Sequence, residues 1–197
     1  WNSLRGDTRM ANDQLKIPAR RRLLSLTGHL ALASVGVPSI VRAMPAVTDG
    51  SRNLSLDHTH TRERITLTYA VDGKYIDPAL TRMNHFLRDH YSGIVGSIDP
   101  RLLDLLYRLQ VAVGSQGGYQ VISGYRSPNT NERLRGKGGK GVARHSLHME
   151  GRAIDVRMPG VPLQDVRDAA LSLKLGGVGF YPRDQFVHVD TGKVRSW

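Results

Sequence analysis

Cysteine is absent from the 197 residues, and acidic side chains are few beside basic ones. Without cysteine there is no disulfide, no thiolate ligand and no cysteine nucleophile, so any metal must be held by histidine and carboxylate side chains. The 17 aspartates and glutamates stand against 28 lysines and arginines, and the formal charge of +11 suits an anionic polymer or surface. No basic run is interleaved with aromatic residues, so nucleic acid is not the expected partner.

A long uninterrupted hydrophobic run is also missing. The mildly apolar stretch of residues 23–41 is broken by His29, Gly36 and Pro38, which argues against a stable membrane span. It follows the arginine cluster of residues 20–22 and precedes small residues, an order typical of an export signal. The arginines and the two leucines after them resemble a twin-arginine (Tat) signal, an address for proteins exported in the folded state.

The chain is therefore expected to contain a signal and one domain. Residues 1–46 would form the export signal, cleaved after Ala43 or Ala46, with residues 1–9 upstream of a true start at Met10. An uncleaved anchor is the alternative. Residues 47–197 are long enough for one globular domain, which we expect in the periplasm without a membrane span after cleavage.

Local patterns in residues 47–197 predict an α+β fold. Residues 47–63 are polar and are interpreted as a loop, with His58 and His60 as solvated surface residues. Residues 65–71 alternate as a strand does, whereas Asp99 and Pro100 introduce an amphipathic helix that ends at Gly114. A second amphipathic helix is expected to end at the glycines of residues 176–177. Helices come first and short strands cluster around the later histidines, which favours a small antiparallel sheet flanked by several helices.

Two of those strands carry polar residues of interest. In "AIDVRM" the apolar residues Ile154, Val156 and Met158 alternate with Ala153, Asp155 and Arg157, and "FVHVD" alternates in the same way around His188. If the aliphatic residues face the core, Asp155 and His188 project from the opposite face of neighbouring strands. A tight bend at Gly151 would bring His148 alongside Asp155.

Two imidazoles and a carboxylate are a suitable ligand set for catalytic zinc. The fourth position then stays open for a water molecule, which the metal activates. Each ligating histidine also needs an acceptor for its other ring N–H, and Asp190, Asp184 or a backbone carbonyl are candidates for His188. The alternative from spacing alone is a pair of ordinary cleft histidines near a structural aspartate.

Longer segments carry a family resemblance. "SLHMEGRAID" resembles the S-x-H-x-x-G-x-A-x-D signature of zinc peptidases in the D-alanyl-D-alanine carboxypeptidase and murein endopeptidase (LAS-type) superfamily. "SGYRSPNTNERLR", "AALSLKLGGVGFYPR" and "FVHVDTGKVRSW" resemble its murein endopeptidase K branch, and the likeness covers residues 65–197.

The resemblance implies roles for particular residues. The zinc ligands of the family fall on His148, Asp155 and His188, and its oxyanion-stabilising arginine falls on Arg126. One position departs from many members, because Gln185 replaces the acid three residues before the last zinc histidine. The identity of the general base is therefore unassigned, and Asp184, Asp190 and His145 are the nearby titratable candidates.

The function implied is that of an exported zinc metallopeptidase acting on the peptide stems of peptidoglycan. The branch resemblance implies endopeptidase cleavage of cross-links between two meso-diaminopimelate residues (3–3 links). Two alternatives stay open. A D,D-carboxypeptidase would need a cationic clamp for a terminal D-Ala, for which Arg133, Arg144 and Arg152 are candidates, and a non-catalytic zinc-containing module would only bind wall peptides.

Overall fold

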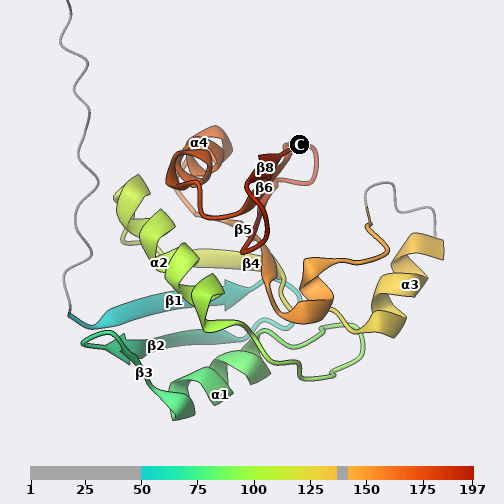
Figure 1. Cartoon of the computed structure of the whole chain (residues 1–197), viewed down its shortest axis with the longest axis horizontal. Coiled ribbons are helices and arrows are strands. Elements are labelled where there is room, and N and C mark those ends of the chain that lie inside the picture. The colour runs from blue at the N-terminus through green and yellow to red at the C-terminus, as the bar shows by residue number, and fades with distance from the viewer. Residues whose placement is uncertain (1–49, 137–141) are drawn as a thin grey trace, which may run out of the picture. The chain divides into compact units, whose positions relative to one another are not determined.

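The computed structural model describes residues 50–136 and 142–197, so the expected export signal lies outside the described residues. In the described part, eight strands form one sheet in the order β3-β2-β1-β4-β5-β7-β6-β8, accompanied by four α-helices (Figure 1). The α+β expectation is confirmed. The expectation of a small antiparallel sheet is wrong, because β1 pairs with β4 and β6 with β8 in parallel.

The elements alternate along the chain rather than falling into a helical half and a strand half. Their bounds are β1 Arg52–His58, β2 Arg64–Val71, β3 Lys74–Tyr75, α1 Asp77–Phe86, α2 Pro100–Val113, β4 Tyr119–Ser123, α3 Pro128–Gly136, the 3₁₀ helix η1 Leu147–Glu150, β5 Ala153–Arg157, α4 Leu163–Leu173, β6 Gly177–Tyr181, β7 Phe186–Asp190 and β8 Arg195–Ser196.

The prediction of a loop at residues 47–63 is wrong, because this segment contains β1, an inner strand of the sheet. β1 lies between β2 and β4. Leu54 and Leu56 are buried, whereas Asn53 is exposed and Ser55 and Asp57 are half-buried, so the strand has the expected two-residue period. The polar residues of β1 lie on the less covered face of the sheet. Because they are numerous, the composition of the segment does not indicate a strand.

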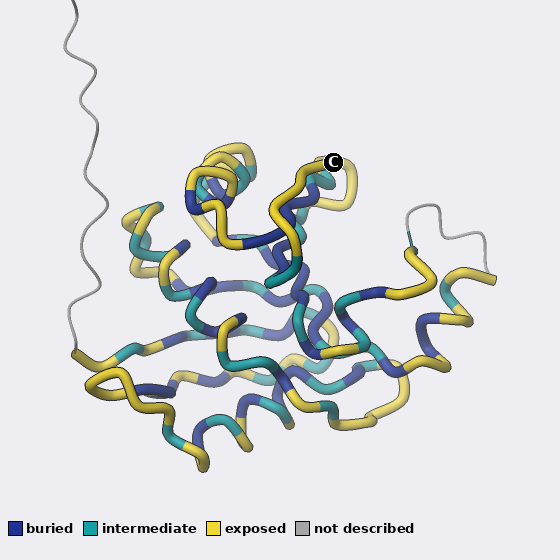
Figure 2. Tube along the Cα trace, in the orientation of Figure 1, coloured by how far each residue is buried: buried dark blue, intermediate teal, exposed yellow. Residues whose placement is uncertain are grey.

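One face of the sheet is apolar and supports the helices. Register places the inward residues of neighbouring strands side by side, as in the pairs Val121–Val156 and Ile154–Val189. Buried residues of α1, α2 and α4, such as Met83, belong to the same core cluster. Figure 1 shows α2 running across the sheet, and Figure 2 marks buried positions along both the strands and the helices. The polar residues that alternate with the core residues therefore project from the opposite face.

Capping residues set the ends of the helices. The Asp99 side chain accepts a hydrogen bond of 3.0 Å from the amide of Arg101 at the start of α2, and Gly114 ends the helix with a φ of 73°, both as predicted. The end predicted for the other amphipathic helix is wrong. α4 ends at Leu173, and Lys174 rather than a glycine adopts the left-handed conformation there, with a φ of 52°.

Among the helices of residues 50–136 and 142–197, none combines the length and apolar character needed to cross a bilayer.

Candidate metal centre

The site lies on the face of the sheet opposite α1, α2 and α4, across three adjacent strands. Asp155 on β5 is paired with His188 on β7, and on its other side with Ser123 on β4. A bulge between Val121 and Ser123 shifts the register there, so that Ser123 rather than Ile122 lies opposite Asp155. The alternation predicted from the sequence thus brings Asp155 and His188 together.

His148 reaches the same place from a turn. It lies in η1, where its own amide donates to the Ser146 hydroxyl, and the turn ends at Gly151 with a φ of 65°. A Cβ at Gly151 would overlap the carbonyl oxygen of Ser97, so both the conformation and the space require glycine. This bend, expected from the sequence, delivers His148 to the start of β5.

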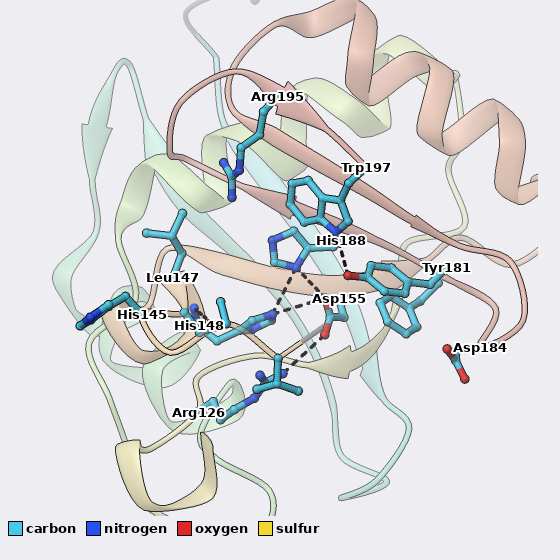
Figure 3. Close-up of a pocket in the computed structure, with 14 residues that line it drawn as sticks. Arg126, His145, Leu147, His148, Asp155, Tyr181, Asp184, His188, Arg195 and Trp197 are labelled. Carbon is cyan, nitrogen blue, oxygen red and sulfur yellow. Dashed lines mark hydrogen bonds and ion pairs between the residues drawn. The ribbon is translucent and has the colours of Figure 1, made fainter. Parts of the chain in front are cut away.

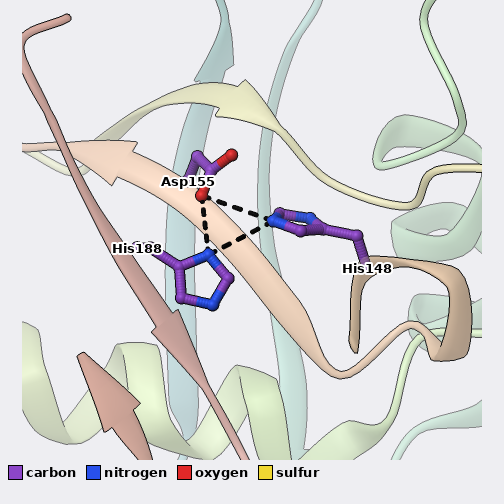
Figure 4. A group of neighbouring side chains, drawn as sticks. All are labelled: His148, Asp155 and His188. Carbon is purple, nitrogen blue, oxygen red and sulfur yellow. Dashed lines mark hydrogen bonds and ion pairs between the residues drawn. The ribbon is translucent and has the colours of Figure 1, made fainter. Parts of the chain in front are cut away.

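The three side chains converge on one point (Figure 4). His188 Nδ1 lies 2.9 Å from Asp155 Oδ1, His148 Nε2 lies 3.4 Å from the same oxygen, and the two ring nitrogens are 3.3 Å apart. One ligand atom from each residue falls within 4.8 Å of the others, and within the described ranges no other group of three such side chains does so. We call His148, Asp155 and His188 the metal-ligand trio.

The outer nitrogen of each histidine is also held. His148 Nδ1 donates to the carbonyl oxygen of Gly124 at 2.8 Å, and His188 Nε2 donates to Asp190 Oδ2 at 3.1 Å. Asp190 is fully buried and also binds Arg195 at 2.7 Å. Acceptors of this kind fix the tautomer and orientation of a ligating histidine, which leaves His148 Nε2 and His188 Nδ1 for a metal.

The electrostatics of the trio favour a cation. Burial raises the pKa of Asp155, but the adjacent His148 and His188 outweigh burial and hold it well below its usual range, so the carboxylate is charged. Burial lowers the pKa of His188, yet its hydrogen bonds to Asp155 and Asp190 prevail and raise it to about 8. In the metal-free protein at neutral pH, His188 is therefore protonated, and its positive charge occupies the place that a metal ion would take.

The donor set fits zinc. Two imidazole nitrogens and one carboxylate oxygen, each supported from behind, are a known ligand set of catalytic zinc, which keeps its remaining position open. The residues that would hold the ion are His148, Asp155 and His188.

An open cavity of about 260 Å³ lies over the trio (Figure 3). Arg126 forms part of its wall, with Nη2 3.9 Å from Asp155 Oδ2, and it contacts Asn131 Oδ1 at 3.4 Å and Ser123 Oγ at 3.5 Å. Aromatic side chains of Tyr181, Phe186 and Trp197 line the side formed by β6, β7 and the C-terminal residues. The cavity therefore combines the ligand atoms, a fixed cation and an aromatic wall.

The three candidate bases occupy different surroundings. His145 is exposed and lines the cavity, and Asp184 lines it from the turn between β6 and β7. Asp190 lies behind His188, where its carboxylate is bound by Arg195 and by the amides of Gly177 and Gly192. Gln185 is exposed, adopts a φ of 59° and donates to the carbonyl of Pro182, and the cavity wall does not include it.

Several residues of the wall carry no signal of a role in the amino-acid sequence. Trp197 packs 5.3 Å from the His188 ring and donates to the Tyr181 hydroxyl at 2.8 Å. It sits over Gly179, where a Cβ would come within 2.7 Å of the indole. β8 has only two residues and pairs in parallel with β6, and β7 lies between the two in the sequence. No local sequence pattern therefore indicates the contact of Trp197 with His188.

The histidines expected at the surface are placed differently. His58 is fully buried next to Phe86, whereas His60 is exposed and stacks on His90 at 4.2 Å between ring centroids. The prediction of a solvated pair is therefore wrong for His58, because β1 carries its side chain into the packed end of the sheet.

Comparison with known proteins identifies the family. Residues 46–197 match the family model described as peptidoglycan L,D-endopeptidase MepK, a group of the M15 peptidases. The chain is 43% identical to peptidoglycan L,D-endopeptidase MepK of Escherichia coli (strain K12) over 92% of its own length and 99% of that protein. It is 38% identical to the probable peptidoglycan L,D-endopeptidase MepK of Haemophilus influenzae, over 90% and 95%. No solved structure matches it significantly. The chain therefore belongs to the MepK family of M15 peptidases.

Proposed function

We propose that this protein is an exported, zinc-dependent endopeptidase that hydrolyses peptide cross-links of peptidoglycan, with 3–3 links between meso-diaminopimelate residues as its substrate. The observation that carries the proposal is the metal-ligand trio, with its ligand atoms within 4.8 Å of one another at the floor of an open cavity. The names of the relatives, peptidoglycan L,D-endopeptidases, support the substrate class.

The chain's own residues suit hydrolysis of an amide. A zinc ion bound to the trio would supply Lewis acidity for the attack of water on a peptide carbonyl. Arg126 lies beside Asp155 and presents a fixed positive charge to the negative charge that develops on the carbonyl oxygen. Asn131 and Ser123 hold the guanidinium in that position.

Proton transfer falls to a group on the cavity wall. Asp190 is a positioning residue in this scheme, because it is fully buried behind His188 and committed to Arg195. Asp184 and His145 line the cavity and remain the candidates for the base. Asp184 is adjacent to Gln185, so it brings a carboxylate to the turn where many relatives in the superfamily have an acid.

Digestion of purified, cross-linked peptidoglycan tests the proposal. The protein would be incubated with zinc and with chelator, and its His188→Ala variant with zinc, before muropeptides are separated and identified by mass spectrometry. We expect 3–3 cross-linked dimers to disappear only with zinc and an intact His188. Asp168→Asn, an exposed change on α4, serves as the control that should retain the activity.

Two other results of this digestion would each favour a different function. Loss of a terminal D-Ala with intact dimers would make the protein a D,D-carboxypeptidase. Unchanged muropeptides from folded, zinc-loaded protein would make it a wall-binding module. Export by the Tat route is tested separately, because the precursor should accumulate in the cytoplasm of cells that lack the Tat machinery.

A further inference from the structure

A second pocket, of about 150 Å³, adjoins the cavity over the trio. We call it the α3-side pocket, and its wall includes His60, His90, Tyr91, Tyr125 and Leu134. Arg126 and Asp155 line both hollows, so the two share the residues at which the peptide bond is proposed to be cut.

The order of the strands places the two hollows on opposite sides of Asp155. Asp155 lies on β5, between β4 and β7. The α3-side pocket is lined by Ile122 and Ser123 of β4, whereas the first cavity is lined by Phe186 and His188 of β7. A chain bound across Asp155 would therefore enter one hollow on each side.

The wall of the α3-side pocket is a stack of flat side chains. The rings of His60 and His90 are 4.2 Å apart and nearly parallel, and Tyr91 lies 4.2 Å from His90. The Arg133 guanidinium is placed over the Tyr91 ring at 4.8 Å. Burial lowers the pKa of His90 to about 4, so this ring is uncharged at neutral pH. The stack thus lines the pocket with aromatic side chains for contact with a peptide, and it places a cation for a carboxylate at its Tyr91 end.

The segment that carries this wall is tied to the start of α3. The Asp89 carboxylate accepts hydrogen bonds from the Tyr91 amide at 2.9 Å and from the Ser127 amide and hydroxyl at 3.0 and 2.6 Å. Asp89 is 1% exposed, so these bonds are formed in a buried position. The stack is therefore held in place before any ligand arrives, which lowers the entropic cost of binding there.

We propose that the α3-side pocket binds one of the two peptide stems of the cross-linked substrate, through Tyr91 in its wall and Arg133 next to Tyr91, while the other stem lies in the cavity next to Trp197. This inference rests on the proposed function. An endopeptidase must accommodate peptide on both sides of the bond that it cuts, whereas a carboxypeptidase releases a single residue. Peptidoglycan stems are peptides with free carboxylates, which match the aromatic side chains of this wall and the Arg133 guanidinium beside Tyr91.

Two variants test the role of this wall in the reaction. Tyr91 is 53% exposed and Arg133 is exposed, so Tyr91→Ala and Arg133→Glu should both fold and bind zinc normally. On a purified 3–3 cross-linked muropeptide dimer we expect each to raise KM roughly tenfold with little change in kcat. Arg108→Glu, the same charge reversal on the exposed side of α2, should leave both constants unchanged. Wild-type KM values in both pocket variants would overturn the inference.

A binding measurement separates this inference from the proposed function. Calorimetry of the same dimer with metal-free protein reports binding without any turnover. Weaker binding by Tyr91→Ala than by the wild type would support the pocket even if the enzyme cut another bond. Equal binding by the two proteins would refute the pocket even if dimers were cleaved as proposed. Failure of the wild type to cleave dimers would count against the proposed function alone.

Discussion

At the level of single residues, charged side chains are held at fixed positions around the point where the substrate is proposed to react. Arg126 and Asp190 illustrate two different ways of acting there. Arg126 lines the cavity and lies 3.9 Å from Asp155, whereas Asp190 is fully buried and acts through His188. Their substitutions should therefore change different measured quantities.

Replacing Arg126 should slow the chemical step. In Arg126→Ala the charge that faces the developing oxyanion is lost, and removal of one such donor typically costs about 10²–10³ in kcat. The trio is untouched, so the zinc content should equal that of the wild type. Steady-state kinetics on the cross-linked dimer measures the effect. A variant with wild-type kcat and a raised KM would show that Arg126 binds substrate without stabilising the transition state.

Replacing Asp190 should weaken the metal instead. Asp190→Asn removes the negative charge that accepts from His188 Nε2, and loss of an outer partner of a ligating histidine typically lowers metal affinity about 10–100-fold. Competition with a calibrated zinc chelator would give the dissociation constant. Asp168→Asn provides the matched control, because it makes the same change on the exposed side of α4. Equal affinities in the two variants would contradict the role assigned to Asp190.

At the scale of elements, the site depends on one turn and on the register of three strands. The 3₁₀ helix η1 ends at Gly151, and its closeness to Ser97 ties the turn to the segment before α2. The His148 position is therefore set by backbone packing as well as by its own hydrogen bond to Gly124.

Two glycine substitutions separate conformational strain from steric overlap. Gly93 and Gly151 both have positive φ, of 74° and 65°, but a Cβ meets nothing within 4 Å at Gly93 and overlaps Ser97 at Gly151. Gly93→Ala should cost about 1 kcal/mol of folding stability, since only the left-handed conformation is penalised. Gly151→Ala should cost clearly more and also lower zinc affinity. Chemical denaturation of the two variants checks this, and equal losses would show that the turn relaxes around a methyl group.

How far the sequence predicts these elements depends on where their signals lie. Asp99, Gly114 and Gly151 act locally, so the two ends of α2 and the bend at Gly151 could be predicted. The two-residue period also placed Asp155 and His188 on a common face. β1 carries no clear signal because its outward residues are polar, and Trp197 carries none because it reaches the site only through the pairing of the C-terminal residues with β6.

At the scale of the whole molecule, buried histidines should make folding sensitive to acid. Burial lowers the pKa of both His58 and His90 from 6.5 to about 4. Between pH 6.5 and 4 these two histidines therefore bind protons in the unfolded chain but not in the folded protein. The folding stability that is present above pH 6.5 is lost as the pH falls towards 4. For zinc-loaded protein we expect the melting temperature to decrease between pH 6.5 and 5, before most carboxylates titrate.

A variant identifies the source of that pH dependence. His58→Leu removes one of the two titrations, so its melting temperature should depend less on pH across the same window, whatever its value at neutral pH. Zinc must be present, because the raised pKa of His188 in the metal-free protein acts with the opposite sign: its contribution is lost as the pH rises through about 8. An unaltered slope in His58→Leu would rule out His58 as the acid-sensitive group.

We propose that one zinc ion held by His148, Asp155 and His188 gives this peptidase its activity. A zinc titration of metal-free protein, with cleavage of cross-linked muropeptide dimers as the readout, distinguishes an activity that needs this ion from one that does not. We predict that activity rises in proportion to added zinc and stops at one ion per chain, and that His188→Ala remains inactive throughout. Activity without zinc, or full activity in His188→Ala, would contradict the account.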